Sequence, residues 1–144
     1  MERTEEELDG FVKAFEAGTL PKQAWTHAAH LTIGGFYIFT YNEEEALSRL
    51  RAGICHLNTC HGVENSDTGG YHESLTIFWL TIIGQFLGVY RSVYPGAERR
   101  DSIEAVVSVF QDRRDLFRNY WSFNVLTSVQ ARRSWMAPDL LPLD

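Results

Sequence analysis

The sequence has few cysteines, no excess of positive charge and no long uninterrupted apolar run. Cys55 and Cys60 are its two cysteines. Their spacing in a predicted helix puts them on different faces, so we expect no structural disulfide. The formal net charge is -6. Nucleic-acid affinity comes largely from lysines and arginines at phosphates, so we expect no nucleic acid as a partner.

Signals for export or for a membrane span are also missing. Residues 1–7 are acidic and polar, so they lack the basic start and the apolar stretch of a signal peptide. The most apolar run, from Leu75 to Tyr90, is interrupted by glycine and polar residues. It is also shorter than the roughly 20 apolar residues that a membrane span requires. We expect a buried helix here, in a cytoplasmic protein that does not bind a membrane.

Helical periodicity dominates the rest of the sequence. Hydrophobic residues make up 44% of the chain and charged residues 22%, which is typical of a protein that folds into a packed domain. No stretch shows the alternation, with a period of two, of a half-buried strand. The sequence therefore predicts an all-α fold: a single-domain helical bundle of about five to six helices over residues 1–144.

Start and stop signals delimit the first three predicted helices. The first covers about Glu5–Ala17 and ends at Gly18. The second begins after Thr26, a typical N-cap residue. The third opens at Asn42, with a glutamate three residues later as in a capping box, and ends near Gly62.

Turn-forming residues fill positions 62–70, and an apolar helix follows from Tyr71. Its apolar residues recur at helical spacing, so we expect it to be the most buried element and the centre of the bundle. Further elements are predicted in the last third of the chain: helices over Ser102–Phe110 and Arg114–Tyr120, a last helix from a cap at Ser122 to Trp135, and an extended tail from Pro138.

Histidines mark the starts of the second and fourth predicted helices. His27 and His30 lie on one helical face about a turn apart, and His72 and Glu73 follow the loop into the apolar helix. The partial positive charge of a helix N-terminus favours neutral imidazole, which binds metal or accepts a proton. If the two helix starts meet, these side chains form a three-histidine, one-carboxylate set suited to zinc, iron, manganese or nickel.

Three functional hypotheses are open at this point. The leading one is a metal-dependent small-molecule enzyme with hydrolase, lyase or transferase chemistry, in which Glu73 and His72 are catalytic. The second is a metal-independent enzyme that uses a histidine and Glu73 as an acid–base pair, in a pocket floored by Gly34 and Gly35. The third is a non-catalytic helical ligand-binding protein in which the histidines and Glu73 satisfy backbone partners and the helix dipole.

Polar residues near these helix starts are the expected contacts for a small-molecule ligand. We predict that Asn65, Asp67, Thr68 and Tyr71 line the mouth of the site and that Arg132 meets an anionic substrate. Most arginines of the last third are expected to pair with nearby aspartates instead. The chain has no Gly-rich phosphate loop, nucleophile elbow or Cys-X-X-Cys motif, so the chemistries marked by those motifs are not predicted.

The motifs resemble those of a family of small bacterial proteins. The resemblance covers most of the chain and is carried by these segments: Trp25-Thr-His-Ala-Ala-His-Leu31, Asn65-Ser-Asp-Thr-Gly-Gly-Tyr-His-Glu-Ser74, Tyr120-Trp-Ser122, Ala131-Arg132 and Pro138-Asp-Leu-Leu-Pro-Leu143. Ser74 stands where the family usually has threonine, and Trp121 is inserted in the third motif. The resemblance implies that His27, His30, His72 and Glu73 belong to the family pattern, and it implies no particular activity.

Overall fold

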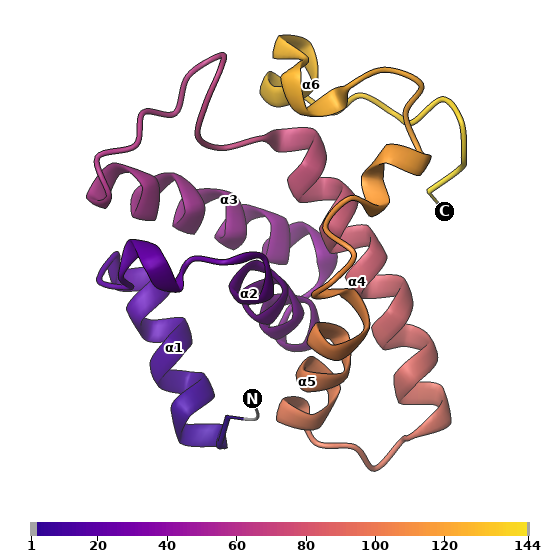
Figure 1. Cartoon of the computed structure of the whole chain (residues 1–144). Coiled ribbons are helices and arrows are strands. Elements are labelled where there is room, and N and C mark those ends of the chain that lie inside the picture. Colours follow the sequence, from indigo (N-terminus) through magenta and orange to yellow (C-terminus); the bar gives the residue numbers. More distant parts are fainter. Residues whose placement is uncertain (1–2, 144) are drawn as a thin grey trace.

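Helices and the loops between them make up residues 3–143, which are the residues that the computed structural model describes (Figure 1). No strand occurs within these residues. The α-helices are α1 (Glu5–Ala17), α2 (His27–Thr40), α3 (Glu43–Cys60), α4 (Glu73–Val93), α5 (Arg99–Phe110) and α6 (Val129–Arg133). Short 3-10 helices are η1 (Lys22–Ala24), η2 (Leu116–Asn119) and η3 (Val125–Thr127). The predicted all-α fold class is therefore confirmed.

The central element is α2, which contacts α3, α4 and α5 (Figure 1). Eight of its 14 residues are buried, against six of the 21 residues of α4. A helix that is apolar all round is buried on every side, and α2 has this character from Leu31 to Tyr37. The expectation that the fourth helix is the centre of the bundle is therefore wrong, since α4 leaves Val89 and Val93 exposed at its far end.

Side-chain caps fix the helix starts that frame the site. Thr26 caps α2 by accepting a hydrogen bond from the N–H of Ala29 at 3.2 Å, and Asn42 caps α3 through the N–H of Glu45 at 2.8 Å. The first helix ends, as predicted, at Gly18, whose φ of 74° lies in the left-handed region that glycine adopts without strain. These local signals were sufficient because each acts within a few residues of the helix end.

The last third of the chain differs from the prediction. The segment predicted as a helix over Arg114–Tyr120 contains the single 3-10 turn η2, and α6 is capped by Ser128 rather than Ser122. Phe117, Trp121 and Val125 are spaced four residues apart as in a helix, but the chain turns between them. All three pack into a cluster with Phe78 of α4. Tertiary burial therefore overrode the local periodicity.

The proline-bounded tail, which was predicted to be extended, bends at residues 139–141 and is tied back to the chain. The N–H of Leu140 donates to the carbonyl of Tyr120 at 2.9 Å, and the indole of Trp121 donates to the carbonyl of Met136 at 3.1 Å. Ser122 binds the carboxylate of Asp139 through its N–H at 2.8 Å and through its hydroxyl. The tail also contacts α4, where the side chain of Gln85 donates to the carbonyl of Leu143.

Within the described residues, one helix, α4, is long and apolar enough to cross a membrane. A core helix passes the same test, and α4 buries Phe78, Leu80, Ile83 and Leu87 against the rest of the chain. Its apolar character is in this way partly used in packing, as expected from the sequence. The helix gives little support for a membrane protein.

Candidate functional site

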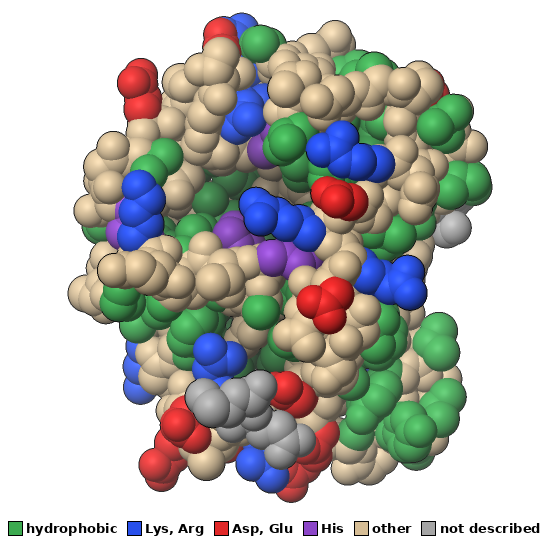
Figure 2. All heavy atoms as spheres, in the orientation of Figure 1, with side chains coloured by type: hydrophobic (Ala, Val, Ile, Leu, Met, Phe, Trp, Pro, Cys, Tyr) green, Lys and Arg blue, Asp and Glu red, His purple; other side chains and the backbone are tan. Residues whose placement is uncertain are grey.

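A cavity of about 930 Å³ lies where α2, α3 and α4 meet, and the segment 114–118 borders it. Figure 2 shows histidine side chains beside Lys or Arg side chains in a hollow near the middle of one face. Leucine, isoleucine and aromatic side chains form much of the lining. Its polar side chains are Thr26, His27, His30, Asn58, Tyr71, His72, Thr76, Arg114, Asp115, Arg118 and Arg132.

Two glycines bring the helices around the cavity close together. A Cβ at Gly34 would lie 3.0 Å from Cδ1 of Ile83, so α2 and α4 approach closely there, and Gly34 lines the cavity. A Cβ at Gly35 would instead meet Ile103 of α5 at 3.5 Å. Of the two glycines predicted to floor a pocket, Gly34 is at the cavity and Gly35 is at a helix contact.

His72 has both ring nitrogens engaged by the protein. It is the N-cap of α4, and Nδ1 accepts a hydrogen bond from the N–H of Leu75 at 3.2 Å. Nε2 donates to the carbonyl of Val125 at 2.9 Å. Burial lowers the pKa of His72, so the neutral ring is favoured. With its lone pair used by the backbone, this histidine has none left for a metal ion or a substrate proton.

Glu73 is held by an arginine and a tyrosine on the side of α3. Its carboxylate accepts hydrogen bonds from Arg51 at 3.0 and 2.6 Å and from the hydroxyl of Tyr71 at 2.6 Å. Burial raises the pKa of Glu73, but these hydrogen bonds outweigh it and hold the pKa below its ordinary value. Tyr71 lines the cavity but Glu73 does not. The carboxylate predicted to be catalytic therefore anchors α4 to α3.

His30 keeps one ring nitrogen available. Nδ1 donates to the carbonyl of Thr26 at 2.7 Å, so the lone pair of the neutral ring is on Nε2, which has no partner within residues 3–143. The ring stacks on Trp25 with 3.8 Å between centroids. Burial lowers the pKa of His30 to about 4, and the nearby His27 and Arg114 lower it as well. At neutral pH this side chain is a hydrogen-bond acceptor in the cavity wall.

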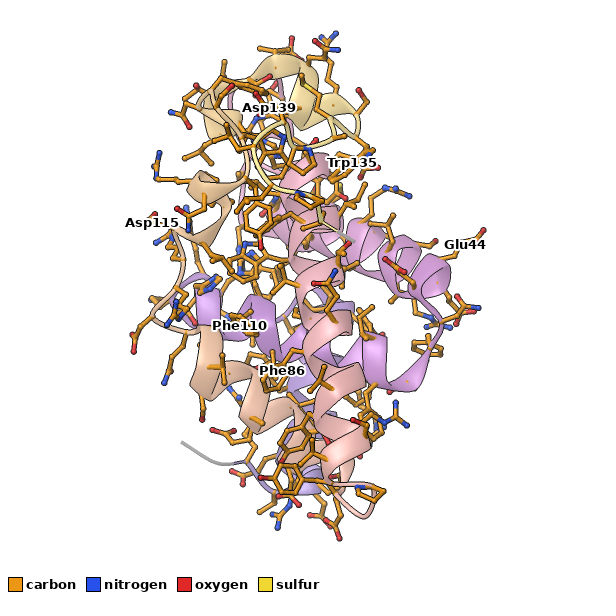
Figure 3. The ribbon with its side chains drawn as sticks, turned by 90° about the vertical axis from the view of Figure 1, so that its right-hand side faces the viewer. Glu44, Phe86, Phe110, Asp115, Trp135 and Asp139 are labelled. Atoms are coloured by element: carbon orange, nitrogen blue, oxygen red, sulfur yellow. The ribbon has the colours of Figure 1, made fainter. Side chains whose placement is uncertain are left out.

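His27 is also half engaged. Nε2 donates to the carbonyl of Phe110 at 3.1 Å, which leaves Nδ1 as the acceptor. Burial lowers the pKa of His27, and the charge of Arg114 acts in the same direction. Figure 3 shows Phe110 at the end of α5, close to Phe86 of α4, and their ring centroids are 5.6 Å apart. The carbonyl that orients His27 therefore belongs to a packed helix end.

The predicted metal set is not assembled. Across residues 3–143, no three His, Cys, Asp or Glu side chains gather in a group that could hold a metal ion. His72 is hydrogen-bonded to Val125 and Leu75, and Glu73 is paired with Arg51. The two remaining imidazoles are fewer than the three protein ligands that hold a typical catalytic zinc.

Three residues predicted at the mouth do not line the cavity. Asp67 forms an ion pair with Arg133, with both contacts at 2.7 Å, and Thr68 is exposed in the loop. Asn65 is exposed as well, and its side chain binds the backbone of Tyr71 and Cys55. Asn65 and Asp67 are therefore bound by groups of the protein outside the cavity.

Arginines give this region its charge. Arg132, which was predicted to meet an anionic substrate, lines the cavity, and its guanidinium donates to the carbonyls of Gly70, Tyr71 and Leu126 at 2.9–3.3 Å. Arg118 lies 3.6 Å from the carboxylate of Asp115.

Arg114 is exposed, lines the cavity, and makes no ion pair or side-chain hydrogen bond in the described part of the chain. Sequence reasoning grouped it with the paired arginines and so missed it, because pairing depends on where the turn after α5 places each side chain. Asn58 was missed too, since one amide on an apolar helical face gives no motif.

Comparison with known protein families, with curated proteins and with solved structures finds no match to this chain. The resemblance of its motifs to those of the small bacterial family stays a prediction. Function has to be inferred from the cavity.

Proposed function

We propose that this chain binds a small organic acid with an apolar body in the 930 Å³ cavity. Three arginines and one aspartate line the cavity, although the whole chain carries a net charge of -6. A local positive field in an acidic protein attracts a small anion without favouring a large polyanion. Concave sites lined by aliphatic and aromatic groups, with few polar ones, are typical of small organic ligands.

Arg114 carries this proposal. Arg118 and Arg132 are engaged with protein groups, whereas the guanidinium of Arg114 is available at the cavity. A guanidinium holds a carboxylate with two parallel hydrogen bonds, which makes it selective for that group. His27 and His30 are neutral beside it, so they offer acceptors and leave Arg114 as the charged contact.

Fluorescence titration tests the proposal, because Trp25 and Trp79 line the cavity and report its occupancy. The probes are phenylpropionate and its uncharged amide, phenylpropanamide, which has the same shape. We expect saturable binding of the acid and binding of the amide that is about tenfold weaker, because the amide lacks the charge-assisted pair.

Neighbouring arginines supply a matched control. Arg114→Gln should lower the affinity for phenylpropionate about tenfold, whereas Arg113→Gln should leave it unchanged, since Arg113 is exposed and does not line the cavity. Equal binding of acid and amide, an equal loss in both variants, or no saturable binding of the acid would each contradict the proposal.

Proton transfer at the bound acid is a second candidate function. The observation in its favour is that His27 and His30 each keep one nitrogen as an acceptor, one helical turn apart in the cavity wall. A positioned imidazole is a common general base.

Phenylpyruvate in heavy water provides the assay for this second function, since a base that removes the proton beside its carbonyl exchanges it for deuterium. We expect exchange with the wild-type chain above the buffer rate and its loss in His30→Gln. Equal exchange rates with wild type and variant would contradict proton transfer, and ligand binding would be the only function proposed.

A further inference from the structure

Asn58 stands out among the polar side chains of the cavity. It lies in the last turn of α3 and is 8% exposed, yet it lines the cavity on the same helical face as Leu50 and Ile54. A polar group buried beside aliphatic side chains is costly unless it is hydrogen-bonded. The partners of the Asn58 amide therefore indicate what this side chain does.

Hydrogen bonds fix the direction in which the Asn58 amide faces. The backbone N–H of Tyr71 can only donate, and it meets Oδ1 of Asn65 at 3.0 Å, so that atom is an oxygen. The Asn58 atom that meets the same oxygen at 3.0 Å must then be the nitrogen, Nδ2. Consequently Oδ1 of Asn58 lies on the side of the amide away from Asn65.

This oxygen has no hydrogen-bond partner within residues 3–143. All enclosed side-chain nitrogen and oxygen atoms in the described part of the chain have partners, so Oδ1 is not sealed in the core. It belongs to a residue that is almost wholly buried and that lines the cavity. Oδ1 is therefore an acceptor that is available to a group bound in the cavity.

We infer that Asn58 determines specificity by accepting a hydrogen bond from a hydroxyl or amino group of the bound acid. The inference depends on the proposed function and narrows its ligand class to hydroxy- or amino-substituted organic acids. Arg114 binds the carboxylate from the segment after α5, and Asn58 binds the second polar group from the end of α3. An unsubstituted apolar acid displaces water from Oδ1 and leaves it unpaired, so it binds less well.

The test compares phenylpropionate with its ortho, meta and para hydroxyl derivatives and with their methyl ethers. In the wild-type chain we expect at least one hydroxylated isomer to bind about tenfold more tightly than phenylpropionate. The matching methyl ether should lose that advantage because it keeps the oxygen but has no proton to donate. This comparison requires no substitution and is independent of any effect on folding.

Substitutions then assign the preference to one residue. Asn58→Leu should bring the hydroxylated and plain acids to equal affinity, whereas Thr59→Val should keep the preference, because Thr59 is the exposed neighbour outside the cavity. Melting curves of both variants check that they are folded. Acid binding with no hydroxyl preference, or a preference that survives in folded Asn58→Leu, overturns this inference alone. No binding of any acid overturns the proposed function as well.

Discussion

The starts of α2 and α4 both carry histidines beside the same cavity, and they differ in what those histidines do. At α4, His72 uses both ring nitrogens within the protein, and Glu73 is held by Arg51. At α2, His27 and His30 each donate one hydrogen bond to a carbonyl and keep the other nitrogen as an acceptor. The histidine at the start of α4 has a structural role, whereas those at the start of α2 each keep one acceptor nitrogen.

Position relative to the cap explains the difference. Thr26 caps α2, so the histidines that follow it lie inside the first turn and are not needed to satisfy the free N–H groups. At α4 the histidine is itself the cap, so a backbone N–H takes its lone pair. A shift of one residue between histidine and cap therefore decides whether the imidazole caps the helix or keeps one nitrogen as an acceptor.

The largest expected effect is on stability at the start of α4. His72→Ala removes the cap and leaves the carbonyl of Val125 without its donor in a buried site, so we expect a loss of about 3 kcal/mol of unfolding free energy. His30→Ala removes a half-buried ring that stacks on Trp25, and it should lower the unfolding free energy by about 1 kcal/mol.

Urea unfolding of both variants measures this contrast. His72→Asn should recover part of the loss, because asparagine is also a good N-cap. Equal losses of unfolding free energy in His72→Ala and His30→Ala would contradict the different roles assigned to the two helix starts.

Acid should destabilise the chain through the start of α2. The pKa of His30 is about 4 when folded against 6.5 for an ordinary histidine. Between these values the unfolded chain takes up a proton that the folded chain refuses. Unfolding free energy should therefore fall as pH drops from 6.5 to about 4, by on the order of 3 kcal/mol. Unfolding curves across this range should show a shallower fall in His30→Gln, and an unchanged slope would contradict the assignment.

A smaller effect is expected from the carboxylate at the start of α4. Glu73→Gln weakens the pair with Arg51, whose side chain is 44% exposed, so the loss at neutral pH should be about 1 kcal/mol. Because the folded pKa of Glu73 is lowered from 4.5, its contribution is present above that pH and is lost as pH falls through the folded pKa. Wild type and Glu73→Gln should therefore converge in stability in acid, and a constant difference would rule out the ion pair as the cause.

The last expectation concerns proton positions and involves no change in stability. Nitrogen NMR of the neutral rings should find the proton on Nδ1 in His30 and on Nε2 in His27 and His72, as their carbonyl partners require. Adding phenylpropionate should shift the ring nitrogens of His27 and His30 more than those of His72, because backbone groups already bind both nitrogens of His72. An equal response of all three rings would contradict the distinction between the two helix starts.

Local signals in the sequence were enough for much of the fold. Thr26, Asn42 and Gly18 mark helix ends by contacts within a few residues, and the structure has helix ends at each of them. The segment between α5 and the tail could not be predicted in the same way. Phe117 and Trp121 have helical spacing there, but burial against α4 decided their conformation.

The candidate site divides along the same line. The sequence by itself determined that histidines stand at two helix starts and that the chain is all-α, because capping and periodicity act over short distances along the chain. Only the tertiary structure decided that His72 donates to the carbonyl of Val125, that Glu73 binds Arg51, and that Arg114 and Asn58 line one cavity. Which partner a polar side chain finds depends on residues far away in sequence, and packing of the helices brings those residues together.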